Sequence, residues 1–426
     1  MTIQVNDGDD DSNIVSRDIN FTAVNDAPTL ANIEATPVFY TEGGSAVGIT
    51  GSTTVSDVDD TNIESAVVSI SSNFSADDVL NFTDQSGITG SYDSVNGILT
   101  LTGSASLTDY QAALQSVTYE NTGDDPSDLT RTVTIQVNDG DNDSNVVSRD
   151  INFTAVNDAP TLASIEVVPV SYTEGGSAVG ITANLSLADL DDVNIESAIV
   201  SISSNFSTDD VLNFTDQSGI TGSYDSVNGI LTLTGSASLV DYRAALRSIT
   251  YENISDDPSD LSRIVSFQIN DGDVDSNIVS RDIDFTAVND APTLANIEVV
   301  PVSYTEGGSA VGITANLSLA DLDDVNIESA RISISNNFAA GEDELIFTDQ
   351  SGITGSFDAA TGTLTLTGSA SVADYQAALT TIAYNNTSDN PSTLTRSVSF
   401  EINDGDLNSN ISVSYTHLTL PTIYSV

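Results

Sequence analysis

The sequence lacks cysteine, lysine and tryptophan, and its one histidine is His417. Without cysteine the chain forms no disulfide, thiolate metal site or cysteine nucleophile. Without a histidine among residues 1–416, that stretch contains no Ser-His-Asp triad, Cys-His pair or histidine-ligated zinc site. A pair of carboxylates, as in glycosidases, stays open on residue type alone. We predict that the chain is not an enzyme, because a catalytic site repeated three times is less plausible than a structural one.

Positive charge is also scarce. The 426 residues include 9 basic ones, all arginine, against 63 acidic ones, for a formal net charge of −54. Such a chain repels nucleic acid and anionic membrane surfaces and attracts cations. Disorder is not expected, since 39% of residues are hydrophobic and they alternate with polar ones. No run approaches the about 18 apolar residues of a membrane span, and no signal peptide opens the sequence.

The chain repeats itself with a period of 132 residues. The motif FTAVNDAPTLA begins at Phe21, Phe153 and Phe285, and 153 − 21 = 285 − 153 = 132. A unit of about 130 residues has the size of an independent domain rather than of a solenoid repeat. We predict the C-terminal piece of a truncated repeat, three complete domains and a non-native tail, with the boundaries 1–26, 27–158, 159–290, 291–412 and 413–426.

Both ends depart from the repeat. Met1 stands where Val133 stands in the next copy, so we expect the chain to open inside a strand of an internal fragment. Residues 413–426, VSYTHLTLPTIYSV, follow no repeat and resemble a translated sequencing adapter. We interpret this tail, with His417, as an artefact and leave it out of the reasoning on the fold.

Each unit has the pattern of an all-β, Ig-like Greek-key sandwich. Short alternating strands are separated by clusters of Gly, Asn, Asp and Ser. Within Glu64–Ser72, alternation places Ala66, Val68 and Ile70 on one side. Ser91–Gly103 predicts a hairpin turning at Asn96-Gly97.

Two further segments complete the unit. Thr132–Pro160 predicts two long strands around an acidic loop, and the second strand leads into the linker. Ser106–Val117 predicts one short helix, because Leu107, Tyr110 and Leu114 share a helical face. Ser106 and Asp109 have capping-box spacing, so we assign Asp109 to capping and Tyr110 to the core.

Acidic residues and asparagine gather in three places per unit. They are the Asn-Asp of the linker, a DxDD motif and an NDGDxDSN loop. In the second unit these are Asn157-Asp158, then Asp189, Asp191 and Asp192, then Asp271, Asp273 and Asp275. In a sandwich the two loops lie at the end where the linker enters. Because Ca²⁺ takes about six to eight oxygen ligands, this convergence predicts a calcium site at each junction.

The unit resembles a cadherin repeat. Tyr172–Ser203 is similar to the cadherin run from an early Glu to Asp-x-Asp, and INFTAVNDAPTL is similar to the cadherin linker. The likeness is closer still to the cadherin-like tandem repeats of large bacterial surface adhesins of the RTX type. Two features differ: Ala155 and Ala159 replace an Asp and an Asn of the linker pattern, and the Leu-Asp-Arg-Glu motif is reduced to Asp109–Gln111.

The resemblance implies Ca²⁺ ligands at each junction, though fewer than in an animal cadherin. For the first junction they are Asn25, Asp26, Asp57, Asp59 and Asp139. For the middle junction they are Glu42, Asn157, Asp158, Asp189, Asp191 and Asp271. For the last junction they are Glu174, Asn289, Asp290, Asp321, Asp323 and Asp404.

Plainer interpretations stand beside the calcium hypothesis. The clusters also fit polar turns on an acidic surface, since Asn-Asp before Ala-Pro is ordinary turn chemistry. An EF-hand-like site within the acidic loop is disfavoured, because the loop lacks the Gly at its sixth position and the Glu at its twelfth. The arginines of the RDI motif, Arg17, Arg149 and Arg281, are expected to pair with nearby carboxylates.

We therefore predict calcium-binding, cadherin-like extender repeats of a large bacterial cell-surface or secreted adhesin, which are extracellular and in which Ca²⁺ rigidifies the domain junctions for cell adhesion. The expected partners are Ca²⁺, neighbouring repeats and a cell-surface protein or glycan, with no nucleic acid and no membrane span in this fragment. One alternative is a passive acidic spacer, stabilised by any salt. Another is a glycan- or protein-binding module, although aromatic residues are only 6% of the chain and suggest no binding platform.

Overall fold

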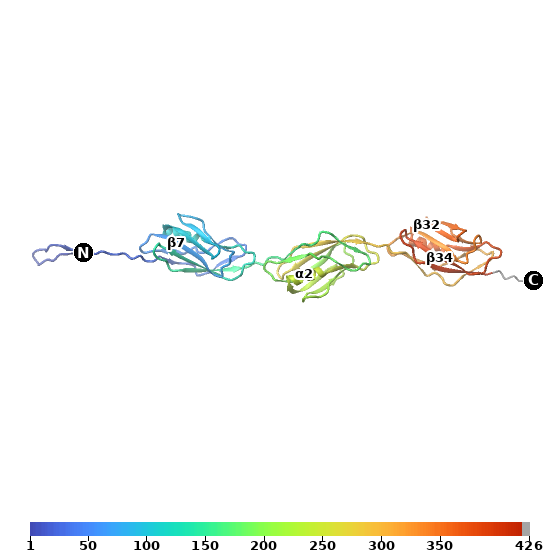
Figure 1. The fold of residues 1–426 in the computed structure, drawn as a ribbon, viewed down its shortest axis with the longest axis horizontal. Coiled ribbons are helices and arrows are strands. Elements are labelled where there is room, and N and C mark those ends of the chain that lie inside the picture. Colours follow the sequence, from blue (N-terminus) through green and yellow to red (C-terminus); the bar gives the residue numbers. More distant parts are fainter. Residues whose placement is uncertain (420–426) are drawn as a thin grey trace, which may run out of the picture. The chain divides into compact units, whose positions relative to one another are not determined.

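The computed structural model describes residues 1–419, and it divides into two compact units. The first comprises Met1–Thr161, Ala188–Asn194 and Asn270–Ser276. The second comprises Leu162–Leu187, Ile195–Ile269 and the chain from Asn277 onward. Within them the chain forms three tandem β-sandwich domains, each with one short helix (Figure 1). The predicted fold class is confirmed.

The first domain shows the topology of all three. Its elements are β3 (Thr29–Ala31), β4 (Val38–Thr41), β5 (Val47–Gly48), β6 (Thr54–Ser56), β7 (Asn62–Ser72), β8 (Asp78–Asn81), β9 (Thr89–Asp93), β10 (Ile98–Ser106), α1 (Leu107–Ser116), β11 (Thr118–Asn121), β12 (Arg131–Asn138) and β13 (Val147–Thr154). A six-stranded sheet has the order β4-β13-β12-β7-β10-β9, and it is joined by the small sheets β5-β11-β8 and β3-β6. Only β4 and β13 pair in parallel among the pairs recorded for this domain.

Period-two alternation builds the core between the layers. In β7 the side chains of Ala66, Val68 and Ile70 are buried, whereas Val67 is 40% exposed. In β12 every second residue from Arg131 onward is buried. The predicted inward face of β7 is therefore confirmed.

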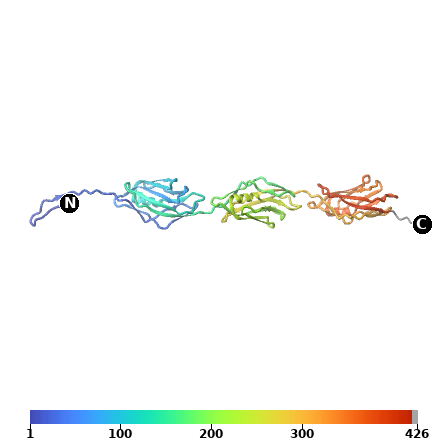
Figure 2. The same ribbon diagram turned by 60° about the horizontal axis from the view of Figure 1, so that its bottom comes forward.

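The predicted hairpin and helix are also confirmed. The turn between β9 and β10 places Gly97 at φ +68°, where glycine has no steric penalty. At the start of α1 the Ser106 hydroxyl accepts the backbone N–H of Asp109 at 3.2 Å, and it lies 2.5 Å from the Asp109 carboxylate. Asp109 thus serves the helix cap, and Tyr110 is fully buried. Figure 2 shows the equivalent helix α2 (Leu239–Ser248) lying alongside the strands of the second domain.

The other domains repeat this order. The strands of the second are β14 (Thr161–Ala163), β15 (Val170–Thr173), β16 (Val179–Gly180), β17 (Ser186–Ala188), β18 (Asn194–Ser204), β19 (Asp210–Asn213), β20 (Thr221–Asp225), β21 (Ile230–Ser238), β22 (Thr250–Asn253), β23 (Arg263–Asn270) and β24 (Val279–Thr286). The third has β25 (Thr293–Ala295), β26 (Val302–Thr305), β27 (Val311–Gly312), β28 (Ser318–Ala320), β29 (Asn326–Asn336), β30 (Asp343–Ile346), β31 (Thr354–Asp358), β32 (Thr363–Ser371), α3 (Val372–Thr380), β33 (Ala383–Asn386), β34 (Arg396–Asn403) and β35 (Ser412–Thr419).

The two ends of the chain were predicted to depart from the repeat. Before the first domain, β1 (Thr2–Ile3) pairs with β2 (Val15–Ser16) in an exposed hairpin. In the predicted tail, β35 pairs with β34 and β26, which is the place that β13 takes in the first domain. The tail's non-native origin stays a prediction, and its residues 420–426 lie outside the described residues.

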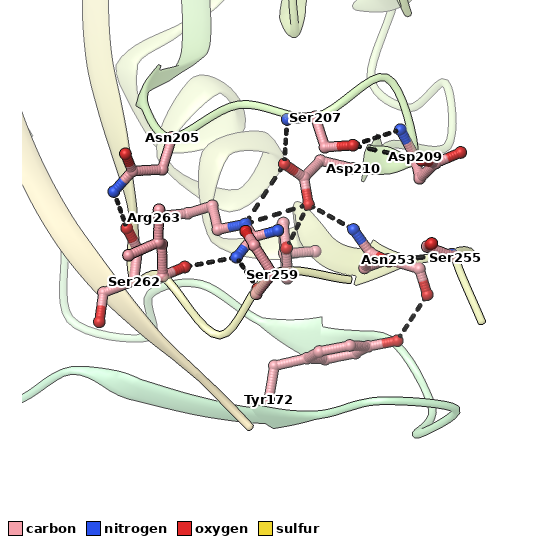
Figure 3. A network of polar contacts seen from close by, with 12 residues as sticks. Tyr172, Asn205, Ser207, Asp209, Asp210, Asn253, Ser255, Ser259, Ser262 and Arg263 are labelled. Carbon is pink, nitrogen blue, oxygen red and sulfur yellow. Dashed lines mark hydrogen bonds and ion pairs between the residues drawn. The ribbon is translucent and has the colours of Figure 1, made fainter. Parts of the chain in front are cut away.

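A buried ion pair inside each domain was not anticipated (Figure 3). In the second domain, Nε of Arg263 lies 3.3 Å from Oδ1 of Asp210, and both side chains are 0% exposed. The Asp210 carboxylate also accepts hydrogen bonds from Tyr251, Asn253 and the backbone of Ser207. The pairs Arg131–Asp78 and Arg396–Asp343 repeat this arrangement. The one signal in the sequence was the arginine's place in the inward phase of its strand.

The RDI arginines join the first and last segments of a domain. Nη1 of Arg149 donates to the carbonyl of Ile49 at 2.6 Å and lies 3.4 Å from Oε2 of Glu34. Arg281 does the same with Ile181 and Glu166. Their predicted pairing is confirmed, whereas Arg17 has no ion pair within residues 1–419, because the short segment around it lacks an equivalent of Glu34.

Candidate metal centre

Three acidic triads occupy equivalent loops, each just before the longest strand of its domain. Within each triad, one carboxylate oxygen per residue lies within 4.8 Å of the others. The triads are Asp57, Asp59 and Asp60; Asp189, Asp191 and Asp192; and Asp321, Asp323 and Asp324. The loop shape explains the grouping: Oδ1 of Asp57 accepts the backbone N–H groups of Asp59 and Asp60 at 3.0 and 2.9 Å. This turn folds the three carboxylates toward one point.

The linker and the acidic loop meet each triad. Nδ2 of Asn157 donates to Oδ2 of Asp271 at 3.0 Å, and the backbone N–H of Asp158 donates to Oδ2 of Asp191 at 3.0 Å. The same pair of contacts recurs in the other copies. They are Asn25–Asp139 with Asp26–Asp59, and Asn289–Asp404 with Asp290–Asp323. Residues more than 100 positions apart in the sequence are thus brought to one place.

The loop aspartate is buried and held as an anion. Asp271 is 7% exposed, and its Oδ1 accepts the backbone N–H groups of Asp273 and Val274, both at 2.7 Å. Burial, the largest influence, pushes the pKa of Asp271 upward, but these N–H groups and the Asn157 amide outweigh it and lower the pKa. Asp139 and Asp404 have lowered pKa values for the same reasons.

The second and third triads hold carboxylates that lack compensation. Burial raises the pKa of Asp189, and the neighbouring Asp191 carboxylate adds to this effect. Asp321 behaves alike beside Asp323. In these two triads, four buried oxygens have no hydrogen-bond partner among the described residues: Asp189 Oδ2, Asp191 Oδ1, Asp321 Oδ2 and Asp323 Oδ1. An orphaned buried carboxylate oxygen is costly unless a cation or donor meets it.

The first triad is more open. Asp59 is exposed, whereas Asp191 and Asp323 are half-buried, and only Asp57 Oδ2 is orphaned there. Burial again pushes the pKa of Asp57 upward, but the backbone N–H groups of Asp60 and Asp59 lower it overall.

The remaining predicted ligands, Glu42 and Glu174, belong to the domain that precedes each linker. Oε2 of Glu42 accepts the backbone N–H of Val156 at 2.7 Å, and Glu174 holds Val288 in the same way. Glu42 lines a surface pocket with Asp124 and Asp158. Sequence reasoning did not single out Asp124; the only signal was the recurrence of an acidic pair before Pro126 and Pro258.

The donor set fits a hard divalent cation. Each triad and its loop aspartate offer only oxygen ligands, and every triad contains at least one orphaned buried oxygen. Carboxylate and carbonyl oxygens in a flexible loop are the ligands of Ca²⁺, whereas Mg²⁺ requires a near-ideal octahedron. Asp60, Asp192 and Asp324 belong to the triads, although the resemblance assigned them no ligand role.

Comparison with known proteins gives distant similarities. No protein-family model matches the chain. It is similar to halomucin from Haloquadratum walsbyi (strain DSM 16790 / HBSQ001), with 27% identity over 339 residues. That match covers 76% of this chain and 3% of halomucin, so the chain spans a very small part of that relative.

Similar solved structures are mouse cadherin-23 EC22-24 and protocadherin gamma B2 extracellular cadherin domains 1-5. The first has 10% identity and a TM-score of 0.32, covering 93% of this chain and 100% of that chain. The second has 13% identity and a TM-score of 0.32, covering 95% of this chain and 62% of that chain.

The strands and triads together define the class of the chain. It consists of three tandem β-sandwich domains, each with one short helix, and the acidic clusters beside the linkers are consistent with Ca²⁺ sites. Among the described residues, no helix has the length and apolarity needed to cross a membrane.

Proposed function

We propose that these domains are calcium-binding extender repeats of a large cell-surface or secreted adhesin. One observation carries the proposal: an acidic triad, a buried loop aspartate and a linker Asn-Asp meet in three copies. Every triad leaves at least one buried carboxylate oxygen without a partner among the described residues, and two of the triads leave two. Similarity to halomucin, a far longer protein, supports a place within a long surface protein.

The residues of each centre suggest how Ca²⁺ would act. Asp189, Asp191 and Asp271 would supply carboxylate oxygens from two loops, and the linker residue Asp158 is already bonded to Asp191. Without a cation the carboxylates repel one another, which favours opening of the loops and movement of the linker. Bound Ca²⁺ supplies the missing positive charge, so linker and loops are held together.

A locked linker would make the repeats a stiff extender that holds a terminal binding domain away from the cell. The same ions would offset part of the formal charge of −54. Extracellular calcium modules commonly bind at roughly 10⁻⁴–10⁻³ M, so the sites would fill outside the cell.

Thermal unfolding of the complete chain tests the proposal. Melting is followed with EDTA, with added Mg²⁺, with added NaCl and during a Ca²⁺ titration. We expect a saturable rise in Tm with Ca²⁺ that neither Mg²⁺ nor NaCl reproduces at matched ionic strength. A rise that depends only on ionic strength would instead establish the passive acidic spacer.

Small-angle X-ray scattering tests the mechanical part separately. We expect the distribution of interatomic distances to narrow and its maximum to become defined when Ca²⁺ is added. Calcium binding without any change in scattering would leave a metal site but remove the locking role.

A further inference from the structure

The linker asparagines contact the loop aspartates through the side-chain amide nitrogen, whereas a calcium ligand must present an oxygen atom. Nδ2 of Asn157 lies 3.0 Å from Oδ2 of Asp271 and 2.9 Å from the carbonyl oxygen of Asp158. Both contacts use the amide N–H₂, which carries partial positive charge. A cation requires the amide oxygen instead.

The same arrangement recurs in every copy. Asn25 donates to Asp139 at 3.0 Å and to the Asp26 carbonyl at 3.3 Å. Asn289 donates to Asp404 at 3.1 Å and to the Asp290 carbonyl at 3.0 Å. Three independent copies with one orientation indicate that the amide has a defined role in the ion-free centre.

Only one oxygen of the carboxylate that receives the amide is held by backbone N–H groups. Oδ1 of Asp271 accepts two backbone N–H groups, so the Asn157 amide is the donor left for Oδ2. Without that donor, a buried anion would stand beside the acidic triad with one oxygen unpaired. Leaving a buried charged acceptor unsatisfied is destabilising.

We propose that the side-chain amides of Asn25, Asn157 and Asn289 take the place of the cation in the ion-free centre and give way to it when it binds. In the ion-free centre the N–H₂ group holds the loop aspartate. On binding of Ca²⁺ the amide turns about its Cβ–Cγ bond and presents Oδ1. This inference rests on the proposed calcium sites and deepens them: an Asn at this position stabilises the empty centre at the expense of calcium affinity.

The chain provides a matched control. In an exposed hairpin of the second domain, Nδ2 of Asn228 donates to Oδ2 of Asp225 at 2.7 Å. Asn157→Asp and Asn228→Asp therefore remove the same kind of amide–carboxylate bond and add the same charge. Only the first change takes place beside an acidic triad.

The experiment compares these two variants in the complete chain by thermal unfolding in EDTA and by calorimetric Ca²⁺ titration. We expect Asn157→Asp to lower the ion-free Tm by about 3–6 °C more than Asn228→Asp does. We also expect it to tighten Ca²⁺ binding at one site by about tenfold, because affinity rises with the number of charged ligands. Asn289→Asp repeats the test in the third domain, and circular dichroism verifies folding.

The outcomes separate this inference from the proposed function. If the wild-type chain binds no Ca²⁺, the proposed function fails, while the ion-free Tm still tests the holding role. If Ca²⁺ binds but Asn157→Asp matches Asn228→Asp in both measurements, this role of the amide is overturned. Weaker Ca²⁺ binding by Asn157→Asp would overturn it too. In ¹⁵N-asparagine spectra, the side-chain resonance lost in Asn157→Asp should shift on Ca²⁺ addition, whereas that of Asn228 should not.

Discussion

Two aspartates of the second repeat, Asp189 and Asp210, differ in how far the fold supplies partners for their carboxylates. Asp210 is 0% exposed, and an arginine, a tyrosine and an asparagine contact its carboxylate. Asp189 is half-buried beside two other carboxylates, and its Oδ2 has no partner among the described residues. The Asp210 carboxylate has its counter-charge within the fold, whereas the Asp189 carboxylate forms no ion pair among the described residues.

The distribution of arginine sharpens this contrast. The chain has 9 basic residues for 63 acidic ones, yet three of the arginines are buried in ion pairs with single aspartates. None of the ion pairs within residues 1–419 involves a triad residue. Three of the scarce positive charges therefore lie inside the domains, and no arginine forms an ion pair with a triad within residues 1–419.

The largest effect is expected at the buried pair. Asp210→Asn keeps the shape but leaves Arg263 as an unpaired buried charge, which costs about 3–5 kcal/mol. We expect the transition of the second domain to move to much lower urea concentration, equally in EDTA and in Ca²⁺. Asp343→Asn provides the same test in the third domain. A loss that Ca²⁺ restores would contradict the division between internal and external counter-charge.

The next largest effect is expected at the triad. Asp189→Ala with Asp191→Ala removes repulsion and two orphaned oxygens, but it also removes the acceptors of the Asp158, Asp191 and Asp192 backbone N–H groups. Because these effects oppose each other, the Tm of the ion-free chain should change little. One bound ion adds about 2.7 kcal/mol to the free energy of unfolding when Ca²⁺ is present at 100 times its Kd, and the variant should lack this stabilisation. Asp225→Ala in the exposed hairpin is the control. Strong destabilisation in EDTA would show that these carboxylates support the fold itself.

Local features of the fold were predictable, and long-range pairing was not. Alternation revealed β7, and Asn-Gly and Ser-x-x-Asp marked the hairpin and the helix cap, because each signal lies within a few residues. The Arg263–Asp210 pair joins residues 53 positions apart. To predict this pair, one must know how the two strands and the intervening loop are arranged. The alternation of residues indicates only that Arg263 points inward.

The candidate site follows the same division. The DxDD motif predicted each triad because its three carboxylates are neighbours in one turn. The meeting of Asn157 with Asp271 was expected only from the general layout of a sandwich. Which end of the amide faces the carboxylate depends on hydrogen bonds that no sequence pattern specifies. Glu42 was assigned by resemblance, whereas the structure shows it bonded to the linker backbone.

A smaller effect is expected where the third domain differs from the second. Arg281 donates to the carbonyls of Ile181 and Val168 and lies 3.5 Å from Glu166. At the equivalent place Ser414 makes one such bond, to Ile313 at 3.2 Å. Arg281→Ser should therefore cost about 1–2 kcal/mol, the value of lost hydrogen bonds from a partly exposed charged group. Ser414→Arg should stabilise the third domain; no gain there would show that the strand carrying Ser414 lacks the geometry of β24.

The smallest effect is a pH dependence whose sign separates the two kinds of carboxylate. Burial pushes the pKa of Glu166 upward, but bonds from Thr182 and Ala183, with the charge of Arg281, lower it to about 2. The stability that Glu166 contributes is thus present above its ordinary pKa of 4.5 and is lost as pH falls toward 2. Asp189, whose pKa is raised, has the opposite sign: its cost to folding stability is full above the raised pKa and is relieved as pH falls toward 3.8.

Glu166→Gln should therefore flatten the acid side of the curve of Tm against pH by about 1–2 °C, a shift kept small by solvent screening. Asp189→Asn should steepen it, because it removes one of the protonation changes that favour folding in acid. Melting curves between pH 6 and 3 in EDTA measure both slopes, and equal signs for the two variants would mean that the triad is not an uncompensated cluster.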